Sequence, residues 1–574
     1  MASILDKLSE PIADSLRREF GGVLDLDPVV LRVVPTANPK FGDYQFNGAM
    51  PLAKQARTKP REIAEKVARA IEGMPWLEKA EIAGPGFVNL WVRKSWLSAE
   101  IRDVYGQERL GVDLPGRNRR IVIDYSSPNV AKPMHIGHIR STILGNALDR
   151  MHRFLGYEVI ADNHIGDWGT QFGILLEGYR RFADPARFEE DPIEELERVY
   201  VEMYALARQD ESLMEKARRE LVRLQQGDPE NRALWERFVQ ASRKEFDRIY
   251  ARLGVSFDFT LGESAYQERL GPLVEDLLAR GLARVSDGAV VIFLEEDGLP
   301  PFLIRKSDGA FNYATTDIAT LLYRQERWDP ERILYVTDER QQLHFRQLFA
   351  VARRLGIRAE LEHVGFGIMR LPEGTFSTRD GNVIRLEKLL DEAERKAYEV
   401  VDQLNPGLPE EEKREIARKV GLGAVKYADL SQNRQSTILF TWEKALSLEG
   451  NSAPYLQYTC ARIQSVWRKY RQELGGGDLL GVEVSLQEEL ELEIAKRILE
   501  FPEHLRRAVA ASRPNLLTDY LFDLASHYNR FYQNLPFLKA PAGTRETRLV
   551  LCGLVDRVLR NALALLGIEV PERM

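Results

Sequence analysis

The chain has 574 residues, 44% of them hydrophobic and 29% charged, which is enough for about three or four domains at roughly 150 residues each and is typical of a globular enzyme. The sequence contains no run of about 18 apolar residues that could cross a membrane. Its formal net charge of -7 excludes a general attraction for polyanions, so any nucleic-acid surface must be local. Cys460 and Cys552 lie far apart, which argues against a disulfide framework or a cysteine zinc site and favours a reducing cytoplasm.

The first hundred residues predict a small α/β domain, which we place at 1–110. The opening MASILDKLSEPIADSLRREF mixes charged and apolar residues at helical spacing, which indicates an intracellular helix and not a secretory signal. The strings NPKFGDYQFNGAMPLAK and AGPGFVNLWV separate aromatic, strand-like runs with glycines. RLGVDLPGRNRR, from Arg109 to Arg120, has the composition of a linker.

The next segment predicts a nucleotide-binding domain at 118–385. The strand IVIDY leads through a loop into the helix ILGNALDRMHRFLGY and the second strand EVIADN, which is the pattern of a parallel α/β sheet. Between about Gly178 and Arg280 the pattern becomes helical and rich in charge, and SDG, EDG and SDG turns then separate short β runs. We interpret residues 178–300 or so as an insertion.

From 386 to 574 helical periodicity predicts an all-α domain. The clearest apolar stripe recurs at helical steps near the end of the sequence, and Gly567 follows it as a natural helix stop. The stripe consists of Leu551, Leu554, Val555, Val558, Leu559, Ala562, Leu563 and Leu566.

The most informative stretch, VIDYSSPNVAKPMHIGHIRSTILGNAL, places His135 and His138 where a loop enters a helix. A helix N-terminus favours anions, and imidazole donors with Lys132 suit the charge that builds on a transferring phosphoryl group. Gly137 would let a nucleotide approach the backbone. Two structural histidines and an ordinary surface lysine are the alternative interpretation.

SPNVAKPMHIGH, from Ser127 to His138, resembles the HIGH signature of class I aminoacyl-tRNA synthetases, in the form found in arginyl-tRNA synthetases. The resemblance implies a Rossmann-type catalytic domain that uses ATP, accompanied by Mg²⁺, to activate L-arginine as an adenylate and transfer it to the 3′-terminal adenosine of tRNA-Arg. Adenylate formation would need bound tRNA. We expect a monomer with no membrane partner, no tightly bound metal and no organic cofactor. The implied ATP contacts are Lys132, His135, Gly137 and His138.

The same resemblance implies that Asp124, Ser127 and Asn129 contact the substrate arginine. A guanidinium or ammonium group in a dry pocket needs a charged acceptor, and Asp124 follows a strand at its carboxyl end, where ligands bind in such sheets. A solvated strand-end carboxylate or a turn cap is the alternative for Asp124.

The string DGAFNYATTDIATLLYR supplies a second carboxylate. Tyr313 and Asp317 share one face if a helix begins near Ala314, and two separated acids would match the two cationic groups of arginine. The resemblance carries substrate contacts onto Tyr313, Asp317 and Gln341, with Gln342 as a neighbouring alternative. Asp317 could equally be a helix cap.

The second class I signature, the KMSKS loop, is expected at GTFSTRDGNVI, from Gly374 to Ile384, which contains neither signature lysine. Arginyl-tRNA synthetases often share this loss, and the resemblance then assigns the missing charge to Lys132. Ser377 and Arg379 are the residues of this loop that we expect to contribute to catalysis.

The string EGNSAPYLQYTCARIQSVWRKY predicts a helix that starts at Ser452 and places Tyr455 and Tyr458 on one face. Aromatic rings stack on unpaired bases, although such a pair can also be core. The string and the ending DRVLRNALALLGIEVPERM resemble the helical anticodon-binding domain of the family. The implied tRNA contacts are Tyr455, Tyr458 and Met574, with Phe87 and Asn89 for the D-loop.

Two other functions remain open from sequence. The chain could be another HIGH-bearing adenylating enzyme, either a synthetase for a different amino acid or a small-molecule ligase. It could also be a noncatalytic tRNA-binding relative, against which the intact His135, His138 and Lys132 argue.

Overall fold

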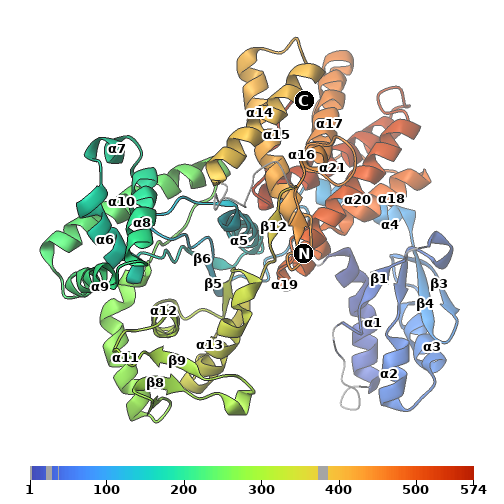
Figure 1. The fold of residues 1–574 in the computed structure, drawn as a ribbon. Helices are drawn as coiled ribbons and strands as arrows, with labels where there is room; N and C mark the ends of the chain where they lie inside the picture. The colour runs from blue at the N-terminus through green and yellow to red at the C-terminus, as the bar shows by residue number, and fades with distance from the viewer. Residues whose placement is uncertain (1–2, 21–26, 28, 37, 373–384) are drawn as a thin grey trace. The chain divides into compact units, whose positions relative to one another are not determined.

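The computed structural model describes residues 3–574 except 21–26, 28, 37 and 373–384, and it divides into two compact units (Figure 1). The first comprises Met1–Leu114, Leu448–Ala564 and Val570–Met574, and the second comprises Pro115–Ser447 and Leu565–Glu569. The change of unit after Leu114 falls within the segment that the sequence predicts as a linker. The predicted ranges 1–110, 118–385 and 386–574 stay predictions.

A four-stranded parallel sheet forms the centre of the second unit, in the order β11-β10-β5-β6. The strands are β5 (Arg120–Asp124), β6 (Glu158–Asp162), β10 (Arg332–Tyr335) and β11 (Glu360–His363). The two strands and the helix predicted after residue 120 are present, with α5 (Ile136–Phe154) between β5 and β6.

The register of this sheet decides where the polar residues gather. Asp124 pairs with Asp162 on one side and with Tyr335 on the other, at the carboxyl ends of their strands. The chain leaves β5 toward β6 on one side, while β10 joins β5 on its other side, so the strand order reverses at β5. Parallel α/β sheets bind ligands outside the carboxyl ends of the strands at such a reversal.

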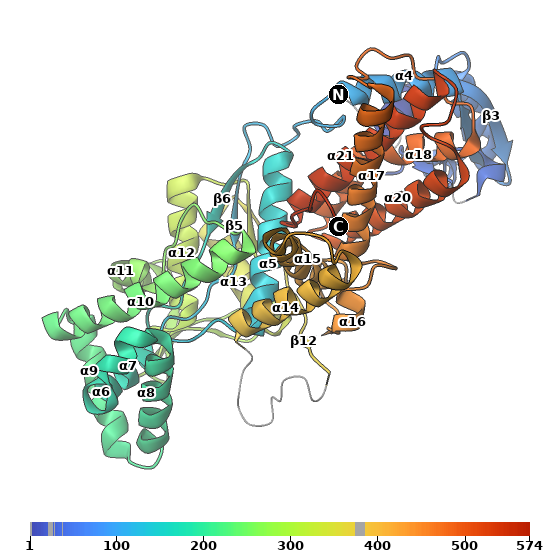
Figure 2. The same cartoon turned by 90° about the horizontal axis from the view of Figure 1, so that it is seen from above.

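Between β6 and β10 the chain forms a mainly helical segment and a three-stranded antiparallel sheet, β7-β8-β9. Figures 1 and 2 show α6 to α9 grouped at one end of this unit. The helices are α6 (Thr170–Phe182), α7 (Pro185–Glu190), α8 (Pro192–Ala207), α9 (Glu211–Gln225), α10 (Pro229–Leu253), η2 (Glu263–Tyr266), α11 (Gln267–Ala279), η3 (Glu295–Asp297) and α12 (Tyr313–Trp328). The strands are β7 (Arg284–Ser286), β8 (Ala289–Ile292) and β9 (Phe302–Arg305).

The second unit also contains two long helices, α14 (Leu386–Leu404) and α15 (Glu410–Leu430), which pack against each other and contact α5 (Figure 2). Arg140 of α5 is 2% exposed and donates to both carboxylate oxygens of Asp429 of α15 at 3.0–3.2 Å. This buried ion pair holds α5 against α15, which belongs to the region from 386 onward that the sequence predicts to be helical. The remaining elements here are η4 (Glu339–Gln341), α13 (Gln342–Leu355), β12 (Met369–Arg370), β13 (Ile438–Leu439) and α16 (Trp442–Ala445).

The first unit joins an antiparallel sheet, β1-β2-β4-β3, to a group of helices from the last third of the chain. Ion pairs connect these parts, with Arg506 at 2.6 Å from Asp6 and Lys496 at 2.6 Å from Asp43. The early elements are α1 (Ile4–Phe20), β1 (Val33–Pro35), η1 (Pro39–Phe41), β2 (Tyr44–Phe46), α2 (Ala49–Ala56), α3 (Pro60–Ile71), β3 (Leu77–Ala83), β4 (Phe87–Val92) and α4 (Lys94–Tyr105). The late ones are α17 (Ala453–Leu474), α18 (Glu489–Leu499), α19 (Phe501–Ala510), α20 (Asn515–Asn534) and α21 (Thr544–Leu565).

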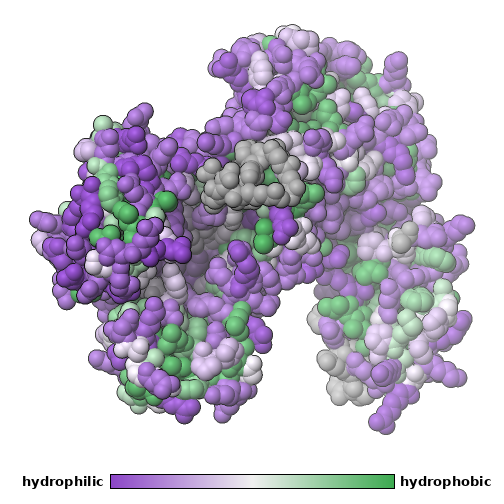
Figure 3. Space-filling model, viewed as in Figure 1, coloured by the Kyte–Doolittle hydropathy of each residue, from purple (hydrophilic) through white to green (hydrophobic). Residues whose placement is uncertain are grey.

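Two predictions for the end of the chain are confirmed. The apolar stripe predicted there is buried along α21, and Gly567 has the positive φ of 70° expected of a helix stop. The face of the molecule in Figure 3 is mainly hydrophilic, with hydrophobic residues in separate patches. Among the helices that the structure describes, none is long and apolar enough to cross a membrane.

Replacing Asp429 by Ala should destabilise the second unit strongly, because it leaves the Arg140 guanidinium buried without its counter-charge. We expect a loss of about 3–5 kcal/mol in the free energy of urea unfolding. Glu392→Ala, which removes an exposed partner of Arg395 on α14, is the control and should cost no more than about 1 kcal/mol. Equal effects of the two substitutions would contradict the structural role of the buried pair.

Candidate active site

The loop between β5 and α5 has an unusual backbone. Three of its residues other than glycine have positive φ: Ser126 at 72°, Ser127 at 48° and Ala131 at 61°. Side chains from elsewhere hold this conformation, because Asn163 Oδ1 accepts from the backbone N–H of Ser127 at 3.1 Å and Ser242 Oγ accepts from that of Ala131 at 2.9 Å. Strained backbone of this kind persists only where its surroundings fix it, and it clusters at functional sites.

His135 and His138 cap the N-terminus of α5 reciprocally. His135 Nδ1 accepts from the backbone N–H of Gly137 at 3.0 Å, and His138 Nδ1 accepts from the backbone N–H of His135 at 3.1 Å. The ring centroids are 3.9 Å apart. The two imidazoles are therefore fixed side by side at the positive end of a helix dipole.

These hydrogen bonds also determine where the imidazole protons lie. Burial and the nearby Lys132 lower the pKa of His135, while burial and His135 lower the pKa of His138 to about 3. Both rings are neutral at pH 7, and because each Nδ1 accepts a hydrogen bond, each proton must be on Nε2. The site thus presents two N–H donors suited to phosphate oxygens.

Gly137 has a more local role than the one expected from sequence. A Cβ at this position would lie 2.7 Å from Cε1 of His135, so glycine is required for the His135 ring to fold over the start of α5. The interpretation that Gly137 makes room for a nucleotide stays a prediction.

Lys132 lies in the same loop, with its Nζ 5.1 Å from the centre of the Tyr200 ring of α8. Its positive charge is close enough to lower the pKa of both His135 and His138. A cation and two neutral donors are therefore held together at the beginning of α5.

A buried ion triad lies at the carboxyl ends of β5 and β6. Arg324 of α12 donates to Asp124 Oδ2 at 2.6 Å and to Asp162 Oδ2 at 2.7 Å, and its side chain is 0% exposed. Burial alone would lower the pKa of Arg324, but the two carboxylates raise it well above its ordinary value. Asp124 is 6% exposed. It is therefore not a solvated carboxylate, and it already has a cationic partner in Arg324.

Asp124 also accepts from Ser127 Oγ at 3.0 Å, so the structure brings these two predicted substrate residues together. Asn129 lies further along the loop, where Gly166 pairs with it in an isolated bridge. A Cβ on Gly166 would come within 2.1 Å of Asn129 Oδ1, so this glycine is needed for the close approach.

Asp317 lies on the second turn of α12, on the same helix as Arg324. It is not a helix cap, because Asn312 caps α12 and Asp317 Oδ2 lies 2.5 Å from His344 Nε2 of α13. Tyr313 is the first residue of α12 and is 68% exposed. Its side chain is therefore accessible to a ligand, while Asp317 is half-buried.

Glu263 of η2 is a further acid in this region that the sequence analysis did not identify. Burial, together with the negative charges of Asp317 and Asp167, raises its pKa to about 8. Partial loss of solvent around the hydroxyl of Tyr313 raises its pKa most, and the negative charges of Glu263 and Asp317 raise it further. No helical or strand periodicity singles out Glu263 within TLGESAY, so only the folded chain reveals that η2, which carries it, contacts α12.

The two glutamines differ in their surroundings. Gln342 Nε2 donates to Glu339 at 2.9 Å, whereas within the described residues no side-chain hydrogen bond is found for Gln341, which ends η4. Gln341 is therefore the freer of the two to meet a ligand. Ser377 and Arg379 lie outside the described residues.

The predicted tRNA contacts in the first unit have unequal exposure. Tyr458 of α17 is 37% exposed and lies 5.0 Å from the Arg462 guanidinium, which also faces the Tyr532 ring at 5.5 Å. Tyr455 is partly internal, and its hydroxyl accepts from Asn529 at 2.8 Å.

Of the two candidate D-loop contacts, Phe87 at the start of β4 is half-buried. Asn89 is 3% exposed and accepts from Gln45 at 2.6 Å, so a direct contact with RNA would require it to leave this bond. Met574 is half-buried at the end of the chain.

Comparisons with known proteins agree with this geometry. Residues 100–442 match the family described as tRNA synthetases class I (R), catalytic domain. The chain belongs to the arginyl-tRNA synthetases. Residues 456–574 match the DALR anticodon binding domain, and residues 6–92 match the arginyl tRNA synthetase N terminal domain.

Individual relatives cover the chain from end to end. It is 46% identical to an arginine–tRNA ligase of Fusobacterium nucleatum, over 96% of each protein, and 44% identical to one of Azotobacter vinelandii, over 99% of this chain and 100% of that protein. Solved arginyl-tRNA synthetases of Plasmodium falciparum and Thermus thermophilus match it with TM-scores of 0.83 and 0.82, each at 26% identity over 100% of both chains. The predicted family and fold class are confirmed, and the enzyme is a class I aminoacyl-tRNA synthetase.

The fixed tautomers can be measured directly. In protein labelled with ¹⁵N-histidine, the signal of His138 should show a neutral ring protonated at Nε2 throughout pH 6 to 8, since its pKa is lowered to about 3. The signal of His135 should show the same neutral tautomer at pH 7 to 8, since its pKa is lowered from the ordinary value. His138→Gln assigns one signal by its loss. A His138 ring that titrated near its ordinary value of about 6.5 would contradict the capping arrangement.

Proposed function

We propose that the enzyme activates L-arginine with ATP and transfers it to the 3′-terminal adenosine of tRNA-Arg. One observation carries this assignment: a group of carboxylates, Asp124, Asp162, Glu263 and Asp317, accompanies the buried Arg324 guanidinium in the same unit as the capped histidine pair. The acids suit a cationic amino acid, and the histidines suit a triphosphate.

On the ATP side, the Nε2–H groups of His135 and His138 and the Lys132 ammonium would contact phosphate oxygens. The attack of the arginine carboxylate on the α-phosphate adds negative charge that leaves with pyrophosphate, and preorganised donors stabilise it without having to reorient. Ser377 and Arg379 remain proposed contributors from the altered KMSKS-like loop.

Mg²⁺ would arrive with ATP and not with the protein. In the described part of the chain, no group of three or more His, Cys, Asp or Glu residues is placed to hold a metal ion. Phosphate oxygens are the usual ligands of Mg²⁺ in enzymes that act on ATP.

On the arginine side, Asp317 and Glu263 are acids that form no ion pair with Arg324, whose partners in the described part of the chain are Asp124 and Asp162. We assign them to the cationic groups of the substrate, with Tyr313 and Gln341 as hydrogen-bonding neighbours. Asp124 would act in the same pocket while sharing Arg324 with Asp162, and Ser127 and Asn129 would complete its wall. A lysine substrate would lose the bidentate contacts of the guanidinium fork.

The tRNA contacts, the monomeric state and the cytoplasmic location remain part of the proposal. The sequence supports local tRNA surfaces through Tyr455, Tyr458, Met574, Phe87 and Asn89. Both cysteines are unpaired and buried, as suits a reducing compartment.

The assignment of Glu263 can be tested through arginine-dependent pyrophosphate exchange with tRNA present. Because the ligand-free pKa of Glu263 is about 8, the carboxyl is largely protonated at pH 7 and must release a proton to pair with a cation. The arginine KM should therefore fall as pH rises toward 8 and level off above it. Of the twenty amino acids, arginine alone should support exchange. Exchange supported by a different amino acid would contradict the proposed function itself.

Glu263→Gln is the matched variant, since it keeps the shape and removes the charge. Its arginine KM should lose this pH dependence and lie about ten- to one-hundred-fold above that of the unmodified enzyme at pH 8.5, which is the range for one charge-assisted hydrogen bond. The ATP KM should be unaffected. An arginine KM equal to that of the unmodified enzyme at pH 8.5 would remove Glu263 from the pocket.

Tyr458→Ala should weaken the binding of tRNA-Arg about five- to one-hundred-fold, because stacking of one base on an aromatic ring contributes about 1–3 kcal/mol. Tyr458→Phe keeps the ring and should bind as the unmodified enzyme does. Filter binding measures both dissociation constants, and the KM values for arginine and ATP at saturating tRNA should not change. Unaltered binding by the alanine variant would count against this tRNA surface.

A further inference from the structure

The contact between Lys132 and Tyr200 joins the proposed ATP site to a helix that the proposed mechanism does not use. We propose that Tyr200 of α8 is a positioning residue that holds the Lys132 ammonium beside His135 and His138 before ATP binds. The inference rests on the proposed role of Lys132 toward ATP phosphates. The ammonium lies 5.1 Å from the Tyr200 ring centre, within the distance of a cation–π interaction.

A neutral ring is a suitable partner for a lysine that must later meet a phosphate. Among the described residues Lys132 forms no ion pair, so none of their carboxylates competes with the nucleotide for its charge. The ring limits the many rotamers of a lysine side chain, and less freedom is then lost when the phosphate binds.

Tyr200 is itself held firmly. It packs against the apolar cluster that contains Ile174 and Met203, and its ring stacks on that of Tyr204 with 5.9 Å between centroids and 5° between planes. Tyr204 is 42% exposed, and because no contact of its ring with Lys132 is found among the described residues, it serves as the comparison.

Arg385 fixes α8 relative to the histidine motif. Its backbone forms a bridge with His135, and the backbone N–H of Leu386 donates to Met134 O at 2.8 Å. The Arg385 guanidinium lies 3.4 Å from Glu194 and 3.3 Å from Glu197 of α8. Glu194, Glu197 and Tyr200 recur every three residues, so one side of α8 contacts both Arg385 and Lys132.

The remainder of this junction is not closely packed. A cavity of about 460 Å³ is lined by Pro133 and Met134 of the loop, by Asp191, Pro192 and Ile193 at the start of α8, and by Arg385. The Arg385 ion pairs and the Lys132–Tyr200 contact therefore carry much of the connection between α8 and the loop.

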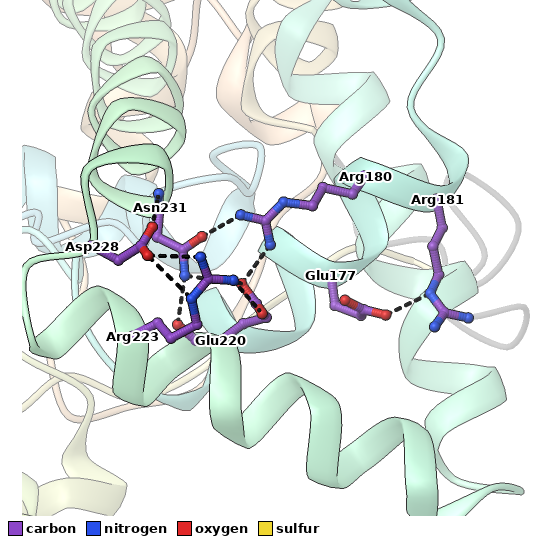
Figure 4. A network of polar contacts seen from close by, with 7 residues as sticks. All are labelled: Glu177, Arg180, Arg181, Glu220, Arg223, Asp228 and Asn231. Carbon is purple, nitrogen blue, oxygen red and sulfur yellow. Dashed lines mark hydrogen bonds and ion pairs between the residues drawn. The ribbon is translucent and has the colours of Figure 1, made fainter.

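A polar network joins the helices that contact α8 (Figure 4). Glu220 of α9 accepts from Arg180 of α6 at 2.5 Å and from Asn231 of α10 at 3.0 Å, while Arg223 lies 2.7 Å from Asp228. Helices α6, α9 and α10 all contact α8. Tyr200 is thus carried by a helix that packs against three others.

The experiment compares Tyr200→Leu, Tyr200→Phe and Tyr204→Leu in arginine-dependent pyrophosphate exchange with tRNA. Tyr200→Leu should lower kcat/KM for ATP roughly 2- to 30-fold, the range of a cation–π contact, and leave the arginine KM unchanged. Tyr200→Phe keeps the π face and should retain the activity of the unmodified enzyme, and Tyr204→Leu, which removes only the stacking neighbour, should lower kcat/KM for ATP less than Tyr200→Leu does. Tyr200→Met serves as a second variant without a ring if the leucine variant does not fold.

A double-mutant cycle shows whether the effect passes through Lys132. By calorimetry, Tyr200→Leu should weaken the binding of α,β-methylene-ATP in the unmodified background and have no further effect in Lys132→Met. Equal losses in both backgrounds, or a phenylalanine variant as poor as the leucine one, would overturn the inference. An unmodified enzyme without arginine-dependent exchange would instead overturn the proposed function.

Discussion

The arrangement of the site depends on one guanidinium shared by two carboxylates. The parallel register places Asp124 and Asp162 directly beside each other at the carboxyl ends of β5 and β6, where two buried negative charges would repel. Arg324 reaches both from α12 and makes this pairing stable. The same ion triad fixes α12 against the sheet, and α12 carries Asp317 and Tyr313. The acids assigned to the substrate are therefore positioned by a cation of the protein itself.

This internal cation also bears on selectivity. Arg324 offsets one of the two negative charges of Asp124 and Asp162, and two further acids, Asp317 and Glu263, lie outside this triad. Burial keeps Glu263 protonated near neutral pH in the absence of ligand, which avoids two facing buried charges. A permanently cationic side chain can restore the ionised form of Glu263. A neutral analogue would leave both acids without a cation from the substrate, with Asp317 in contact with the His344 imidazole. Discrimination of this type depends on the cost of unpaired buried charge and not on pocket size.

Much of this could be predicted from the sequence, for identifiable reasons. Strong periodicity gave β5, α5, β6 and the buried stripe of α21, because alternation and helical spacing are local properties. The capping role of Ser452 was also visible, since its Oγ accepts from the backbone N–H of Tyr455 at 3.2 Å. The histidine motif was recognisable because its spacing follows the geometry of a helix start.

What the sequence could not reveal arises from contacts between distant segments. Arg324 lies 200 residues from Asp124, and nothing in its own helix distinguishes it from a surface arginine. Glu263 becomes significant only because η2 packs against α12. The expected roles of Asn89 and Tyr455 illustrate the converse, since a motif match does not show that Gln45 and Asn529 already bind those side chains.

The histidine pair and Lys132 show how a single short motif combines two kinds of constraint. Both Nδ1 atoms are used by the backbone at the start of α5, so the helix cap itself determines the tautomer of each ring. In the described part of the chain no backbone hydrogen bond to the Lys132 side chain is found, and the ammonium contacts a ring on a helix more than sixty residues away in the sequence. Local sequence can specify the imidazoles, but it cannot specify the lysine. A chain that lacks both lysines of the second signature must hold this remaining one through its tertiary structure, and the insertion provides the surface on which it rests.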